Sequence, residues 1–349
     1  MPWLKFALGS LILGAVICAS ASAQSSNLAT ESDPDTQPAR SFQIQVRTLF
    51  DQESFSQLDD IAEAARTQKQ HFLGGGWKLR TFYNALRGPG SLTSTDDVWN
   101  AHFARLERWI AASPNSSAPR TALAGAYLRF AWKARGNGEA DTVTSEGWDL
   151  FEQRVQKARK TLDDAKSISA SNPQWYLEME TVALAQGWTR EMTDKLVQDA
   201  SNVEPDYFYI YNKQANYLLP KWYGKPGDSE EFLKSTADRI GGAEGDFIYF
   251  EVARDLNCCR AKQQMPNLSW DRVKQGFAAL EKLYGSTNQQ LNALAFMAVR
   301  QGNSETAQQL FTRIGDNWDE VVWGTKDKFE RSKSTLSLAP KNDVTAAAR

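Results

Sequence analysis

The sequence predicts an all-α fold made of paired helices, and three observations support this prediction. Nearly every segment from Phe42 to Gly324 places apolar residues at helical spacing. No segment shows the sustained alternation of a half-buried strand. Glycine and proline end the segments at intervals that group them in pairs. With 349 residues, the chain is long enough for one extended domain or two compact ones.

The N-terminus predicts export. Lys5 precedes an apolar run from Phe6 to Ala19, and Ala21-Ser22-Ala23 follows as an A-x-A cleavage site. The run is shorter than the roughly 20 residues that span a bilayer. We therefore expect a signal peptide over 1–23 that is cleaved after Ala23. The product would be a periplasmic or secreted protein with no stable membrane span.

The regions that flank the helices are polar. Residues 24–41 hold two prolines and no apolar periodicity, so they are predicted to be a disordered linker. Residues 325–349 are similarly polar and are predicted to be a flexible C-terminal tail. The helical-repeat domain is therefore expected over 42–324.

The helices of this domain follow in order. The first two are expected over 56–70 and 93–113, the second capped by Ser94 or Thr95. Between them, Gly74-Gly75-Gly76 is expected to let the chain bend. Further helices are expected over 118–138 and 148–169, with helix pairs over 175–200, broken near Gly187, and 291–314, broken at Gly302.

The spacing of small residues in these pairs is typical of tetratricopeptide repeats. The match is closest in the last pair, where the pattern positions are Leu294, Ala295, Ala298, Gly302, Ala307 and Phe311. Leu123, Ala124 and Tyr127 match the first helix of another unit, whose second helix follows only after an insertion. The sequence thus predicts an irregular tetratricopeptide-like helical-hairpin repeat array.

Four stretches resemble a known bacterial family, the domain of unknown function 4034. They are Trp99–Gly136, Trp148–Ala165, Pro173–Glu180 and Tyr217–Asp228, and the similarity covers about Leu49 to Trp323. The most distinctive parts are Ala-Trp-x-Ala-Arg-Gly and Leu-Leu-Pro-Lys-Trp-Tyr-Gly. The resemblance implies a bacterial, helical, repeat-like and often exported protein, and it carries over no catalytic residue.

The stretch 205–228 is unusually aromatic. A helix that is apolar on most sides is usually sandwiched between neighbours, which places Tyr211 in the core. Pro220 ends this helix, and a loop rich in glycine and proline follows, with Trp222 and Tyr223 beside Lys221. The loop is predicted to contact a ligand or partner. The alternative is an aromatic plug that closes a groove.

The sequence predicts no catalytic residue, no metal site and no cofactor. His71 and His102 belong to no HExxH motif, and His102 is expected to be a partly exposed packing residue. Glu178 and Glu180 diverge on a helix and make a poor acid–base pair, although a carboxylate pair formed across helices stays open. A net charge of −2 gives no electrostatic reason to expect a nucleic-acid partner.

The cysteines leave one alternative open. A lipobox carries a small residue before its cysteine, but Ile17 precedes Cys18, so lipidation is not expected. After cleavage only Cys258 and Cys259 remain. They form either a strained vicinal disulfide or two buried thiols on one helix.

Two classes of function follow from these patterns. The first is an exported, non-enzymatic helical-repeat protein that binds a protein or peptide partner on a groove. The alternative is an envelope hydrolase or carbohydrate-binding protein that stacks its substrate on an aromatic cluster. The predicted contact residues are Trp77, Tyr83, Tyr211, Lys221, Trp222 and Tyr223, and all but Lys221 form the aromatic cluster.

Overall fold

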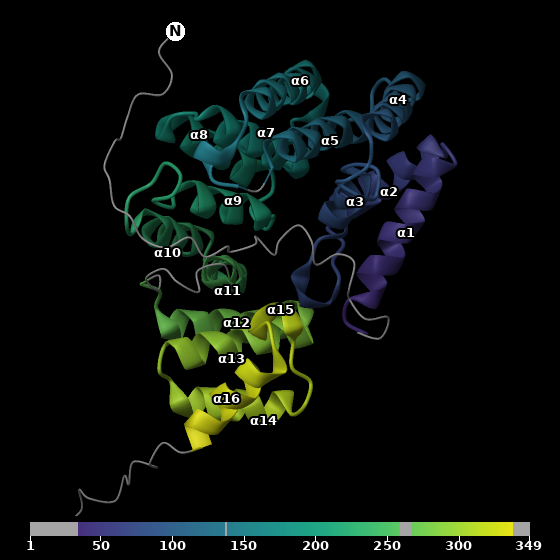
Figure 1. The fold of residues 1–349 in the computed structure, drawn as a ribbon. Helices are drawn as coiled ribbons and strands as arrows, with labels where there is room; N and C mark the ends of the chain where they lie inside the picture. The colour runs from purple at the N-terminus through teal and green to yellow at the C-terminus, as the bar shows by residue number, and fades with distance from the viewer. Residues whose placement is uncertain (1–33, 137, 259–266, 338–349) are drawn as a thin grey trace, which may run out of the picture.

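The protein is all-α, as the sequence predicts. The computed structural model describes residues 34–136, 138–258 and 267–337, and these residues form α-helices and two short 3-10 turns without any named strand. A first group of helices forms a row in which each helix contacts the next, called the inner row here, and it ends with α13 (Asn288–Arg300) in the lower part of Figure 1. It comprises α3 (Lys78–Leu86), α5 (Ala118–Arg135), α7 (Pro173–Gln186), α9 (Tyr209–Tyr217), α11 (Gly242–Cys258) and α13.

The other helices surround this row. Most of them alternate with the inner helices along the chain: α4 (Asp96–Ala112), α6 (Ser145–Ser169), α8 (Arg190–Val203), α10 (Asp228–Ile240), α12 (Trp270–Tyr284) and α14 (Ser304–Ile314). The ends add α1 (Gln37–Asp51), α2 (Phe55–Thr67), α15 (Glu320–Trp323) and α16 (Lys326–Ser337). Each inner helix contacts the next inner helix, so the row is continuous from α3 to α13.

Two predicted boundaries are wrong. Helix α1 begins at Gln37, inside the predicted linker 24–41, because a proline stands in its first turn and Val46 and Phe50 bury its inner side. Helix α16 begins inside the predicted tail 325–349, where Phe329 is fully buried against Trp323 and Phe311. A few apolar residues suffice to hold each terminal helix to the body.

Helix ends inside the array follow the local signals in the sequence. Gly187 takes the left-handed conformation with φ +62° and ends α7, and Gly302 with φ +69° separates α13 from α14. Thr189 caps α8 through the amide of Met192. Thr287 and Gln290 form a reciprocal capping box on α13. The predicted breaks at both glycines are confirmed.

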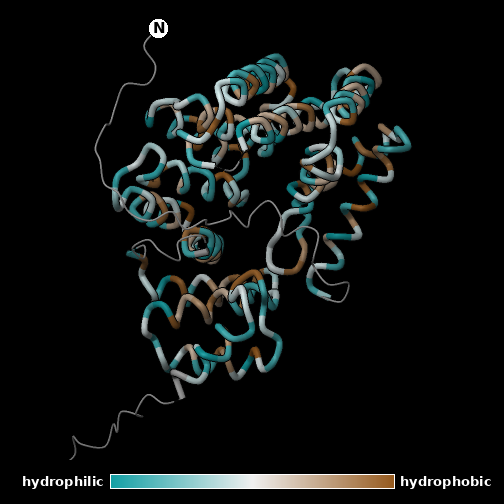
Figure 2. The backbone as a smooth tube through the Cα atoms, viewed as in Figure 1, coloured by the Kyte–Doolittle hydropathy of each residue, from teal (hydrophilic) through white to brown (hydrophobic). Residues whose placement is uncertain are grey.

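The core runs through the array as one continuous apolar cluster. The largest fully buried side chains are aromatic and include Trp77, Trp99 and Trp109. Figure 2 shows hydrophobic segments interleaved with hydrophilic ones along the helices. Helix α7 differs, because every residue from Pro173 to Leu184 is buried and it is enclosed by α3, α5, α6, α8 and α9. It is the centre of the upper part of the molecule.

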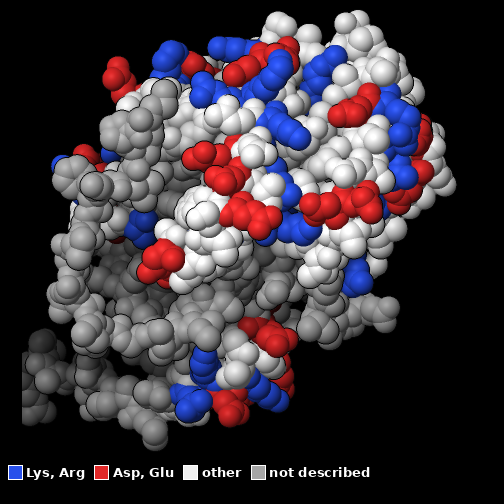
Figure 3. Space-filling view, turned by 45° about the horizontal axis from the view of Figure 1, so that its top comes forward, with Lys and Arg blue, Asp and Glu red and all other residues white. Residues whose placement is uncertain are grey.

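Charged residues of both signs are interspersed over the face drawn in Figure 3. This mixture agrees with the small net charge of the chain. Within the described ranges, no helix combines the length and apolar character needed to cross a bilayer.

A loop near the N-terminus joins the two ends of the array. This segment, residues 68–77 between α2 and α3, is called the glycine loop below. The carbonyl of Gly74 accepts a hydrogen bond of 2.9 Å from Gln290 Nε2 on α13, and the ring of His71 lies 4.8 Å from that of Tyr284 on α12. Lys69 reaches back to Glu204 at 2.7 Å. The predicted bend at the three glycines is therefore a point of tertiary contact.

The glycine loop fits only because its glycines lack side chains. Gly75 has φ +76°, and a Cβ atom there would lie 2.7 Å from Cζ of Phe247, a buried ring on α11. Both the backbone conformation and the missing volume thus require glycine.

We expect Gly75→Ala to lower the free energy of unfolding by about 2–4 kcal/mol, because it adds a steric clash to backbone strain. Gly302→Ala is the matched control, because Gly302 also has positive φ but nothing within 4 Å of its Cβ position. It should cost about 1 kcal/mol. Chemical denaturation measures both values. Equal losses would contradict the close packing of the glycine loop.

Candidate functional site

Two glutamates lie in the middle of the buried helix α7. Glu178 and Glu180 are 1% and 6% exposed. Burying a carboxyl group is costly unless it is paired or neutral. The two side chains, which point to different sides of the helix, meet this requirement in different ways.

Glu178 is held by charge. Its Oε1 accepts a hydrogen bond of 2.6 Å from Gln174 Nε2 and lies 3.8 Å from Arg80 Nη1. Its Oε2 lies 3.8 Å from Arg87 Nη2 and has no hydrogen-bond partner. Arg80 lies on α3, and Arg87 is the residue that caps its C-terminus. In the inner row, α5 stands between α3 and α7. The ion pairs are longer than a direct hydrogen bond, so they leave donor groups of both arginines available to other acceptors.

Packing fixes the position of Glu178. Tyr207 donates a hydrogen bond of 2.6 Å to Gln174 Oε1, which orients the Gln174 amide toward the carboxylate. Gly125 on α5 makes room, because a Cβ atom there would lie 3.3 Å from Glu178 Cδ. Thus α5, α7 and the segment before α9 all hold this one group in place.

Glu180 is held without a partner. Neither of its carboxyl oxygens has a hydrogen bond, and burial raises its pKa well above the usual value, against a smaller opposite effect of Lys213. We therefore expect Glu180 to keep its proton to a higher pH than an exposed glutamate does. Burial, followed by repulsion from Arg87 and Arg80, lowers the pKa of Lys213 to about 8.

Arg80 and Arg87 flank Glu178, and Lys213 and Arg129 lie within electrostatic reach of Arg87. We call these four cations the inner cationic cluster. Arg87 is central, because it lowers the pKa of both Lys213 on α9 and Arg129 on α5. Burial lowers the pKa of Arg87, attraction to Glu178 raises it, and repulsion from Arg80 lowers it further. The cluster draws on α3, α5 and α9 and thus spans the inner row.

A small apolar groove, with a volume of about 50 Å³, lies further along the same row. It is lined by Arg254 and Asn257 of α11, by residues of α13, and by Val321 and Val322 of α15. The α13 residues are Gln289, Ala293, Phe296 and Met297. Val321 is 56% exposed, so one edge of this groove is open to solvent.

The predicted aromatic cluster does not converge on one pocket. Trp77, Tyr83 and Tyr211 are buried in the core at separate places: Trp77 packs on Tyr207, whereas Tyr83 accepts a hydrogen bond from Asn172. Tyr211 hydrogen bonds with Ser201. These three side chains therefore offer no open stacking platform, which removes the structural motive for the carbohydrate-binding alternative.

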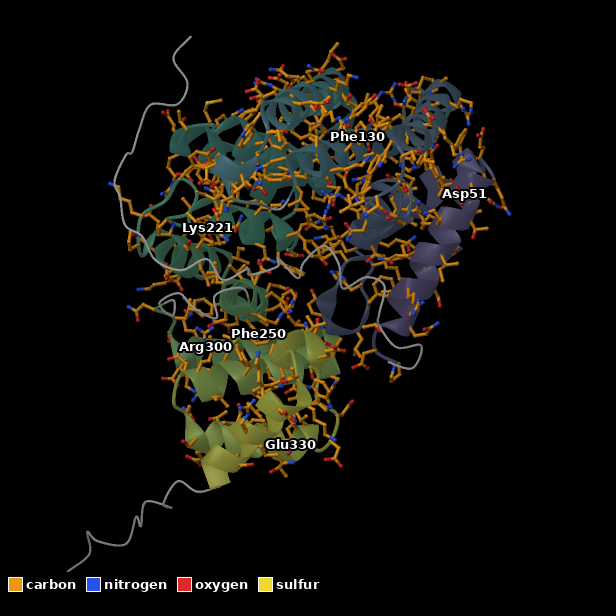
Figure 4. All side chains as sticks on the ribbon, viewed as in Figure 1. Asp51, Phe130, Lys221, Phe250, Arg300 and Glu330 are labelled. Carbon is orange, nitrogen blue, oxygen red and sulfur yellow. The ribbon has the colours of Figure 1, made fainter. Side chains whose placement is uncertain are left out.

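The loop after α9 is partly exposed to solvent. Lys221 is exposed and lies apart from Phe130 of α5 (Figure 4). Trp222 packs against a small cluster that contains Leu184 and Leu218. Tyr223 is half exposed, and its ring stacks on Tyr217. Trp222 is therefore packed against the body of the protein, while Lys221 stays accessible.

Both histidines pack against aromatic rings. His102 is buried, not partly exposed as predicted, because its Nε2 bonds the carbonyl of Leu86 at 2.8 Å and its ring packs on Phe50. Burial lowers the pKa of His71 and of His102 to about 4. The predicted alternatives for Cys258 and Cys259 lie outside the described residues. In the part of the chain that is described, no three metal-ligating side chains come together.

Sequence reasoning missed the inner cationic cluster. One signal was available: Arg80 and Arg87 stand seven residues apart, on the same side of a helix, and two glutamates interrupt an otherwise apolar segment. Comparison with family models, curated proteins and solved structures finds no match for this chain. The resemblance to the domain of unknown function 4034 thus stays a prediction.

We expect Glu178→Gln to lower the free energy of unfolding by about 2 kcal/mol at pH 7, because it removes the one charge that balances Arg80 and Arg87. Glu180→Gln should leave stability unchanged or raise it. In the folded state Glu180 keeps its proton above pH 4.5, whereas the unfolded chain loses it near that pH. Because the unfolded state then binds fewer protons, the contribution of Glu180 to the free energy of unfolding decreases as pH rises.

Denaturation of both variants at pH 4 and pH 7 tests this difference. The gain of Glu180→Gln over the wild type should be larger at pH 7 than at pH 4. A Glu180→Gln variant that loses as much stability as Glu178→Gln would show that both carboxyl groups are ionised in the folded protein.

Proposed function

We propose that this chain is an exported, non-enzymatic helical-repeat protein that binds a peptide segment of a protein partner along its inner row. The observation that carries the proposal is the apolar groove of α11, α13 and α15, with the exposed Val321 at its edge. Grooves between helices bind peptides through a few apolar anchor residues. Polar groups at the side of the groove, such as Asn257, would orient the peptide backbone.

The arrangement of the inner row supports the same function. Helical arrays bind extended partners on the surface that their inner helices form. Here that row carries both the apolar groove and, further toward the N-terminus, the inner cationic cluster. A single peptide can use apolar contacts in one region and polar contacts in the other. The export signal predicted over 1–23 places such a partner in the cell envelope or outside the cell.

A random peptide library selected on the whole protein tests this proposal. Fluorescence anisotropy then gives Kd for the selected peptides with Val321→Glu and Val98→Glu. Val98 is the matched control, because it is a valine of similar exposure, 46%, on the outer helix α4.

Val321→Glu should weaken binding by at least about tenfold, because it places a charge in the apolar groove. Val98→Glu should change Kd by less than about twofold. Equal effects of the two variants, or the absence of selected peptides, would overturn the proposal.

A further inference from the structure

The inner cationic cluster carries more positive charge than its surroundings balance. Lys213 makes no hydrogen bond or ion pair with any described residue, and Arg87 Nε is buried without a partner. Glu178 approaches two of the arginines only to 3.8 Å, and Asp255 on α11 acts on Lys213 through charge without an ion pair. Glu180 does not offset the remaining charge if it keeps its proton.

Like charges repel one another within the cluster. Burial, and after it repulsion from Arg87 and Arg80, lowers the pKa of Lys213, while burial followed by Arg87 and Arg47 lowers that of Arg129. Like charges held close together in a protein destabilise one another, and the effect grows as water is excluded. An anionic group placed among them would relieve this repulsion and gain charge-assisted hydrogen bonds.

The cluster is reachable from solvent. The side chains of Arg80 and Arg87 keep 17% and 24% exposure, and Lys213 and Arg129 are also partly exposed. Arg80 is oriented from below by the ring of Tyr209, with its guanidinium carbon 5.6 Å from the ring centroid. Arg80 is therefore held in place before any ligand arrives, which lowers the cost of binding.

We propose that the inner cationic cluster binds a carboxylate of the partner peptide, supplied by an aspartate or glutamate side chain. The inference rests on the proposed peptide-binding function and adds a chemical class to it: the partner segment is acidic next to its apolar anchor. Arg87 and Lys213 supply the main contacts, because both have donor groups without partners in the described structure.

The probe for this site is a fluorescein-labelled peptide of ten glutamates, and its neutral counterpart is a peptide of ten glutamines. Anisotropy is measured with the whole protein and with Arg87→Gln, Lys213→Gln and Lys234→Gln. Lys234 is the matched control, because it is an exposed lysine on the outer helix α10. Denaturation of each variant confirms that it is folded.

We expect the glutamate peptide to bind the wild type, and Arg87→Gln and Lys213→Gln to weaken binding by about tenfold each. Lys234→Gln should bind as the wild type does, and the glutamine peptide should not bind. The inference is overturned if the glutamine peptide binds equally well, or if all three variants match the wild type. It is also overturned if inorganic phosphate displaces the probe more strongly than acetate at equal ionic strength, since the site would then prefer phosphate.

The two proposals fail separately. Suppose that Val321→Glu abolishes binding of library peptides, while Arg87→Gln and Lys213→Gln leave the Kd of the glutamate probe unchanged. The peptide-binding proposal then stands and the carboxylate site does not. If the probe depends on Arg87 and Lys213 but no library peptide depends on Val321, the charged site exists and the peptide groove is wrong.

Discussion

The contact between the glycine loop and α13 is the constraint on which the arrangement of the array depends. Gln290 donates to the carbonyl of Gly74 at 2.9 Å and to Glu251 Oε1 at 2.7 Å, while its own Oε1 accepts from the amide of Thr287 at 3.0 Å. One buried amide thereby connects the loop before α3 to α11 and α13. Because unpaired buried polar groups are costly, these bonds hold the early and late helices in one relative position.

This closure holds the helices of the inner row in fixed positions relative to one another. An open array of helix pairs holds only neighbours together, so distant helices are free to change their spacing. Here Trp77, at the end of the glycine loop, packs on Tyr207 and donates its backbone amide to Tyr209. The loop therefore fixes α3 against α9, and with it the distance between Arg87 and Lys213. The inner cationic cluster depends on that distance.

Sequence patterns predicted the elements well and their long-range contacts poorly. The helix breaks at Gly187 and Gly302 were predictable because a left-handed residue is a local requirement. The terminal helices α1 and α16 were missed because so few residues, such as Phe329, anchor them. The inner cationic cluster was missed because Arg87 meets Glu178 only after the chain has passed through α4, α5 and α6. Periodicity describes one helix face and does not say which distant face will cover it.

Native-state hydrogen exchange tests the closure most directly. The amide of Phe72 bonds the carbonyl of Gly76 at 2.8 Å inside the glycine loop, and the amide of Gln301 bonds Met297 at the end of α13. If the loop is part of the closed array, the Phe72 amide should exchange with the same free energy of opening as the central amides of α13. Exchange of Phe72 at a free energy several kcal/mol lower, with α13 still protected, would show that the loop opens independently and would contradict the closure.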